Sequence, residues 1–199
     1  MYQDPYRLRL AALMSHQLTN GEDDMSTKQL IKMLNELGKD VEKHIHNLNH
    51  GGCAVFAAHV GYALKYRAGL SNVVIRIGNS WADDESDLVS VDEARNNVHP
   101  NANASQWNSA GLSFGHVILE FVTGKTKKKL RHYDSSGVTG ASNVTNNFGF
   151  NLHPGYMTVE EGLQIASEQD GWNSCFDREQ IPQLIQIIDK HFSRYAAEH

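Results

Sequence analysis

The spacing of apolar residues predicts two helices near the start of the chain. Residues 5–18 carry apolar side chains along one side of a helical projection. Ser26 followed three positions later by Gln29 forms the pattern of a capping box, which starts a second helix. Apolar residues then recur at helical intervals, so this helix ends at Gly38 or continues to about residue 46.

Three further helices follow from the same analysis. Residues 53–65 are small and mostly apolar on all sides, which is typical of a helix at the centre of a domain. Thr158 and Glu161 form a second capping-box pattern at the start of a helix that reaches about residue 169. Residues 177–195 have an apolar stripe and predict an amphipathic C-terminal helix.

Strands are predicted between the central and C-terminal helices. Residues 72–77 and 114–122 are rich in β-branched and aromatic side chains, and a turn at 123–126 joins the second run to a further strand over 127–134. The polar segments 78–112 and 135–156 read as long loops, with a short helical turn near residues 91–94. Because helices and strands are segregated along the chain, the predicted fold class is α+β.

Composition limits the classes of function. The chain has 199 residues and a net charge of −5, which does not favour nucleic-acid binding. No apolar run approaches the ~20 residues needed to cross a bilayer, and we expect no signal peptide, membrane association or cofactor. Two cysteines do not make a disulfide framework, so we expect a cytoplasmic protein. We expect a single domain over residues 1–199, while the oligomeric state stays open.

The segment from Asn47 to Cys53 carries the most informative chemistry. It reads as a loop that ends in Gly51 and Gly52, with Cys53 in the first turn of the central helix. The unpaired N–H groups and positive dipole at a helix N-terminus favour a thiolate over a thiol. The glycines would let another molecule approach the backbone closely. Cys53 is therefore a candidate nucleophile.

A nucleophilic cysteine needs a base and a group that orients that base. His116 at the start of one predicted strand and Asp134 at the end of the next are the candidates. If residues 124–126 form a three-residue loop, His116 lies directly opposite Asp134 on the same face of the hairpin. Their β-carbons would then be about 5 Å apart. Each residue alone would more often be structural; their joint placement supports a Cys53–His116–Asp134 triad.

The order of cysteine at a helix start, histidine on a strand and aspartate on the next strand resembles the papain-like superfamily. The nearest branch is that of transglutaminase-like proteins and arylamine N-acetyltransferases. The resemblance implies a central Cys53 helix packed on a small antiparallel sheet with flanking helices. It divides the domain into N-terminal helices over 1–46, a catalytic core over 47–156 and C-terminal helices over 157–199. It also implies an oxyanion hole made by the Cys53 N–H and the side chain of Asn47, with Asn49 or His50 as alternatives.

These residues together predict a cysteine-dependent hydrolase or acyl transferase that acts on an amide through a thioester. A protein or peptide substrate would bind in a cleft shaped by the two polar segments. The candidate cleft residues are His50, Trp81, Trp107, Phe148 and Phe150.

Three alternatives stay open at this level, one of which is a purely structural or inhibitory partner protein. The chain could keep the fold as a catalytically inactive binding or inhibitory module. It could also be a metal-dependent hydrolase that uses the histidine cluster His44, His46 and His50. However, no CxxC or HExxH pattern is present, and we expect no metal ligands. Cys175 reads as a structural residue, and the lysine-rich stretch 125–131 reads as a solvated hairpin turn.

Overall fold

The computed structural model describes residues 27–79, 88–124, 128–140, 151–167 and 176–197. The side chains of residues 49, 50, 139, 140 and 167 are outside this description. The predicted helix over 5–18 and the capping residue Ser26 also lie outside the described residues. Among the described helices, none combines the length and apolar character that a bilayer span needs.

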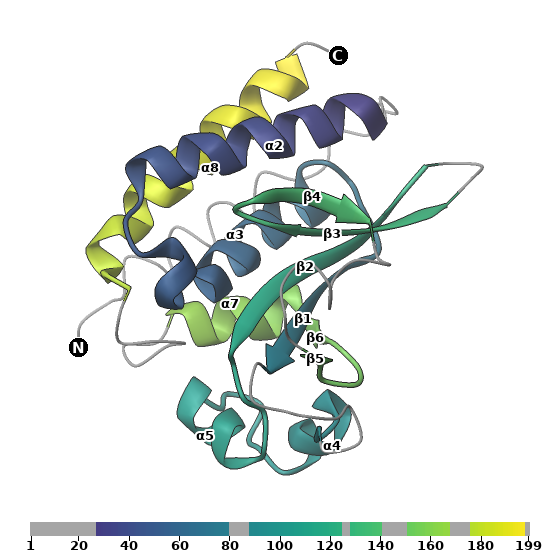
Figure 1. Cartoon of the computed structure of the whole chain (residues 1–199), viewed down its shortest axis with the longest axis vertical. Coiled ribbons are helices and arrows are strands. Elements are labelled where there is room, and N and C mark those ends of the chain that lie inside the picture. The colour runs from purple at the N-terminus through teal and green to yellow at the C-terminus, as the bar shows by residue number, and fades with distance from the viewer. Residues whose placement is uncertain (1–26, 80–87, 125–127, 141–150, 168–175, 198–199) are drawn as a thin grey trace.

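The protein is an α+β structure in which helices pack on a small antiparallel sheet (Figure 1). The described residues form six strands, of which five follow the order β4-β3-β2-β1-β5 and β6 pairs with β1. The strands are β1 (Val73–Asn79), β2 (His116–Thr123), β3 (Lys129–Asp134), β4 (Gly137–Gly140), β5 (Asn151–Leu152) and β6 (Met157–Thr158). The predicted strands over 72–77, 114–122 and 127–134 are thus confirmed. Strands β4 and β5 lie within the segment 135–156 that was predicted to be a loop, and β6 directly follows it.

Helix α3 (Cys53–Tyr66) lies at the centre of the core, as its small apolar sequence predicts. It contacts β1, β2 and β3 as well as helices α7 (Val159–Ser167) and α8 (Ile181–Ala197). Gly61 makes this packing possible, because a β-carbon there would lie 2.8 Å from the Leu119 side chain. The hydrophobic core is therefore built around the helix that begins with Cys53.

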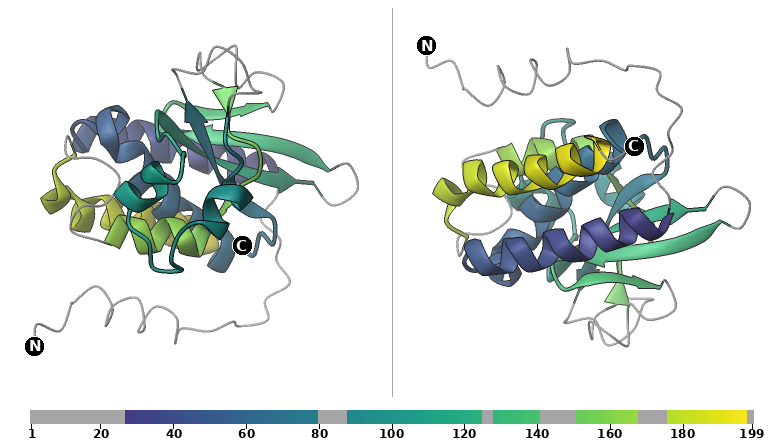
Figure 2. Two further views of the ribbon diagram at one scale, coloured as in Figure 1. Left: turned by 90° about the horizontal axis from the view of Figure 1, so that it is seen from below. Right: turned by 90° about the horizontal axis from the view of Figure 1, so that it is seen from above.

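Helices α2 (Thr27–His44) and α8 pack side by side, as Figures 1 and 2 show. Helix α2 continues through Gly38, which decides between the two predicted endpoints. Asp40 joins the pair, since its carboxylate lies 3.0 Å from Nε2 of His191 and 3.4 Å from Nζ of Lys190. These bonds hold the C-terminal helix against the N-terminal one. The hydrogen bond from His191 lowers the pKa of Asp40, and burial, which raises this pKa, does not cancel the effect.

Two short helices occupy the segment over 78–112 that was predicted to be mostly loop. They are α4 (Val91–Asn96) and α5 (Ala104–Ser109), and they lie together near the ends of β1 and β2 in Figure 1. Helix α5 was missed although its sequence signal is present. Asn103 accepts a hydrogen bond from the Gln106 backbone at 2.9 Å, and the Gln106 side chain returns one to Asn103, which makes a capping box.

The predicted pairing of β2 with β3 is wrong by two residues. Leu119 pairs with Tyr133, not with Arg131, because the connection spans residues 124–128 and not a three-residue turn. A shift of two preserves which side chains share a face, whereas a shift of one would have reversed them. His116 and Asp134 therefore stay on one face as a diagonal pair.

Candidate active site

Cys53 begins helix α3, as the sequence predicts, but the segment before it is not a loop. Residues Leu48–Gly52 form a π-helical turn that runs directly into the helix. Such turns are rare and occur often at functional positions. Cys53 is a half-buried cysteine that forms no disulfide.

The two glycines before Cys53 are explained by the protein's own packing. Gly51 has φ of 112°, a backbone conformation that favours glycine. A β-carbon on Gly52 would lie 2.6 Å from Cδ2 of Phe176, so the Phe176 ring occupies the space next to this residue. The close approach predicted for another molecule is thus made by a side chain from a distant part of the same chain.

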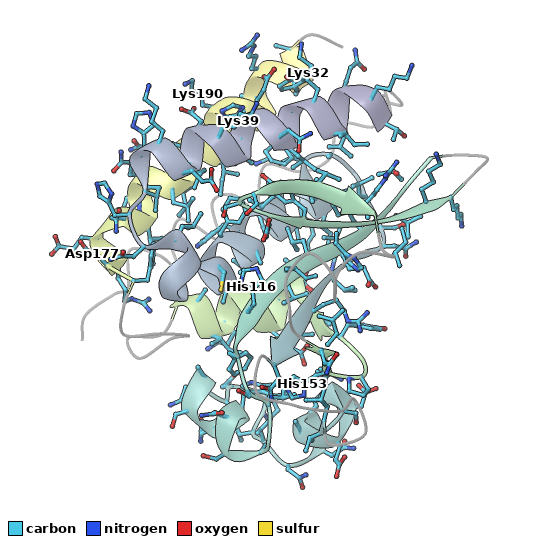
Figure 3. All side chains as sticks on the ribbon, viewed as in Figure 1. Lys32, Lys39, His116, His153, Asp177 and Lys190 are labelled. Carbon is cyan, nitrogen blue, oxygen red and sulfur yellow. The ribbon has the colours of Figure 1, made fainter. Side chains whose placement is uncertain are left out.

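His116 connects the cysteine to the aspartate. It lies at the start of β2, where Figure 3 shows its labelled side chain near the beginning of α3. Its Nε2 atom lies 3.2 Å from Oδ2 of Asp134, and its side chain also hydrogen-bonds to Cys53. The structure therefore brings together the three side chains of the predicted triad.

Asp134 is held rigidly by two different bonds. Its carboxylate is only 5% exposed, and while Oδ2 faces His116, Oδ1 accepts a hydrogen bond of 2.8 Å from the Ser136 backbone. That second bond is the usual way in which aspartate stabilises a turn. The turn joins β3 to β4, where Asp134 pairs with Gly137. The turn-forming and histidine-orienting roles are thus carried by the two oxygens of one carboxylate.

The neighbour of Asp134 fixes β3 against the helices. The Tyr133 ring packs on Phe56, one turn along α3 from Cys53, with ring centroids 5.5 Å apart. Its hydroxyl donates a hydrogen bond of 2.8 Å to the Leu34 carbonyl in α2. Burial raises the pKa of Tyr133, so the phenol stays protonated as this bond requires. Tyr133 therefore sets the distance between the strand that carries Asp134 and the helix that carries Cys53.

The electrostatics of the site favour a charged histidine. Burial alone would lower the pKa of His116, but hydrogen bonds to Asp134 and Cys53, together with their negative charges, raise it from 6.5 to about 9. His116 is therefore an imidazolium at neutral pH.

The other predicted site residues lie at the surface, in the core or outside the described residues. Asn47 is exposed with φ of 58°, and its side chain does not cap the turn that follows it. Trp107 is 4% exposed and belongs to the hydrophobic core, so its ring packs inside the α5 region. The side chains of Asn49 and His50 lie outside the described residues, as do Trp81, Phe148, Phe150 and Cys175.

The described members of the histidine cluster considered for metal binding lie at the surface. His44 and His46 are exposed, and Nε2 of His44 lies 3.4 Å from Oδ1 of Asp40 on the same helix. Among the described side chains, no three His, Cys, Asp or Glu residues are grouped so that they could hold a metal ion.

Comparisons with family models, with curated proteins and with solved structures find no match to this chain. The function of this protein is therefore inferred from the geometry of the site.

Proposed function

We propose that this protein is a cysteine-dependent hydrolase or acyl transferase that acts on an amide bond, in a peptide or an isopeptide. Cys53 is the nucleophile, His116 the acid and base, and Asp134 the group that orients His116. The observation that carries the proposal is the contact of one imidazole with both the sulfur and the carboxylate. That arrangement is the geometric signature of an activated nucleophile.

The first half of the reaction uses the charged pair. The Cys53 thiolate attacks the amide carbon and forms a C–S bond, while the carbonyl oxygen takes up the electron pair. As the tetrahedral intermediate collapses, His116 gives its proton to the departing nitrogen, the C–N bond breaks and a thioester remains. The side chain of Asn47 or Asn49 is the proposed oxyanion donor and contributes about 3 kcal/mol. The backbone N–H of Cys53 is taken up by the helical turn over residues 48–52 that leads into α3.

The second half follows from the causes of the raised His116 pKa. Once the sulfur is in a thioester, it has no negative charge to stabilise the imidazolium, while burial continues to oppose it. His116 then loses its proton more readily and can accept one from an incoming water or amine. That molecule attacks the thioester, and Cys53 is released. The same residue thus serves as acid in the first step and as base in the second.

The fold supports a finer proposal. A cysteine at the start of a central helix, packed on an antiparallel sheet whose adjacent strands carry histidine and aspartate in that order, resembles the papain-like architecture of transglutaminase-like proteins. We accordingly propose this architecture for the chain, with a protein or peptide as the substrate. The cytoplasm is the compartment that fits a free catalytic thiol.

The test measures the reactivity of the thiol and then turnover. Iodoacetamide should alkylate Cys53 rapidly at pH 6, and His116→Ala should slow this reaction by about tenfold or more. Mass spectrometry of the Cys53 peptide separates this signal from that of Cys175. Equal rates in the two proteins would contradict the proposal.

Turnover distinguishes the two reaction types. A denatured protein is incubated with the enzyme and a fluorescent primary amine. New N-termini indicate hydrolysis, and fluorescent protein indicates acyl transfer. Cys53→Ala is the control and should abolish both products. A reactive Cys53 whose substitution by alanine changes neither product would contradict the enzymatic proposal and favour a binding module.

A further inference from the structure

One segment just before helix α8 contacts the chain shortly before the turn that precedes Cys53 and again at the last residue of that turn. The Gln180 side chain accepts a hydrogen bond of 2.7 Å from the His46 backbone N–H. Its Nε2 atom donates one of 3.3 Å to the His46 carbonyl. The amide therefore satisfies both backbone groups of a residue 134 positions away in the sequence.

The other end of the turn is held by an apolar contact. Phe176 is 4% exposed, and its ring fills the space that a side chain on Gly52 would need. Gly52 is the residue directly before Cys53. Gln180 thus holds the backbone two residues before the turn over 48–52, and Phe176 packs against the last residue of that turn.

The holding segment is itself anchored. Residues Arg178–Gln180 form a 3-10 turn capped by Asp177, whose Oδ1 accepts a hydrogen bond of 3.0 Å from the Glu179 N–H. Arg178 donates a bond of 2.9 Å to the Ala166 carbonyl near the end of α7. Phe176 and Gln180 therefore belong to a short segment that hydrogen bonds hold in place.

We infer that Gln180 and Phe176 are positioning residues, which set the place of the Cys53 sulfur relative to His116. The inference deepens the proposed function and rests on it. The physical reason is that Cys53 and His116 come from different layers of the fold, the helix and the sheet. Their contact requires that the backbone leading into α3 is held in one position. This matters because displacements of about 1 Å change reaction rates strongly.

Two substitutions of Gln180 make the inference testable. Gln180→Ala removes both bonds to His46, whereas Gln180→Glu keeps an acceptor for the N–H but removes the donor to the carbonyl. Gln183→Ala is the matched control, since Gln183 is exposed on α8. Phe176→Leu gives an independent variant that keeps an apolar side chain next to Gly52.

The readout is the pH profile of Cys53 alkylation by iodoacetamide, followed by mass spectrometry of the Cys53 peptide. We expect Gln180→Ala to lower the rate at pH 6 by roughly tenfold, with Gln180→Glu and Phe176→Leu between it and the wild-type protein. At pH 10, where free thiols ionise, the rates should converge. Circular dichroism and the melting temperature establish that each variant is folded.

The outcomes separate the two proposals. If folded Gln180→Ala and Phe176→Leu both follow the wild-type and Gln183→Ala profiles, the positioning role is overturned and the proposed function stands. If wild-type Cys53 itself reacts no faster at pH 6 than it does in His116→Ala, the proposed function fails and the positioning role fails with it. A rate loss confined to low pH in the Gln180 and Phe176 variants supports both.

Discussion

His116 Nε2 lies 3.2 Å from Asp134 Oδ2 although the two residues are diagonal neighbours across β2 and β3. In a diagonal pair the side chains must lean along the strands to meet. The bond from the Ser136 N–H to the other carboxylate oxygen keeps Asp134 in that orientation. The contact between His116 and Asp134 therefore depends on the turn after β3 as well as on the pairing of the strands.

Substitution of either partner of His116 should lower the pKa of this histidine from about 9 toward 6.5. Asp134→Asn removes one negative charge and Cys53→Ala removes the other. In the double variant only burial remains, so the His116 pKa should fall below 6.5. Titration of the histidine ring signals by NMR measures this directly. An unchanged midpoint in both single variants would contradict the proposed ion pair.

The stabilisation that His116 provides should depend on pH with a defined sign. The pKa is raised from 6.5 in the unfolded chain to about 9 in the folded protein, so the contribution is complete below pH 6.5 and is lost as the pH rises through 9. The upper limit is about 3 kcal/mol. The difference in unfolding free energy between wild type and His116→Gln, measured in urea at pH 6, 7.5 and 9.5, should shrink accordingly. For the exposed His46, His46→Gln should give a small difference at each pH.

Gly38→Ala should destabilise the protein although alanine is the better helix former. The intrinsic gain in a helix interior is about 1 kcal/mol. However, the new β-carbon would lie 2.4 Å from the Ser135 carbonyl oxygen, which is backbone and cannot rotate away. We expect a net loss of about 1–3 kcal/mol. Thermal unfolding measures it, with Lys39→Ala at the adjacent exposed position as the control. A melting temperature above that of wild type would contradict the contact.

Arg95→Met should weaken the attachment of α4 to α7. The Arg95 guanidinium contacts Asp92, donates to the Tyr156 carbonyl at 2.8 Å, and forms two bonds to Glu161. Burial would raise the pKa of Glu161, but Arg95 lowers it. We therefore expect a loss of about 1–2 kcal/mol at pH 7 that becomes smaller as the pH falls and Glu161 is protonated. Urea unfolding at pH 7 and pH 4 measures the change. An equal loss at both pH values would contradict an electrostatic origin.

Local sequence signals predicted much of the fold because local interactions produce them. The Thr158–Glu161 capping box forms both of its bonds, at 2.7 and 3.1 Å. The apolar runs at β1 and β2 gave strands. Helix α5 was not predicted, although its capping residue is an asparagine, which is one of the residues that cap helices well. The two-residue strands β5 and β6 have no period to detect, and pairing with β1 defines them.

By itself, the sequence determined that a cysteine begins a central helix and that a histidine and an aspartate lie on one face of a hairpin, because both statements depend on periodicities of a few residues. Only the tertiary structure decided that the three side chains meet, that the hairpin is paired two residues away from the expected register, and that Gln180 and Phe176 hold the turn before Cys53. These features join residues that are far apart in the chain. Side-chain volumes and hydrogen-bond geometry select them when the chain folds, and no local pattern encodes them.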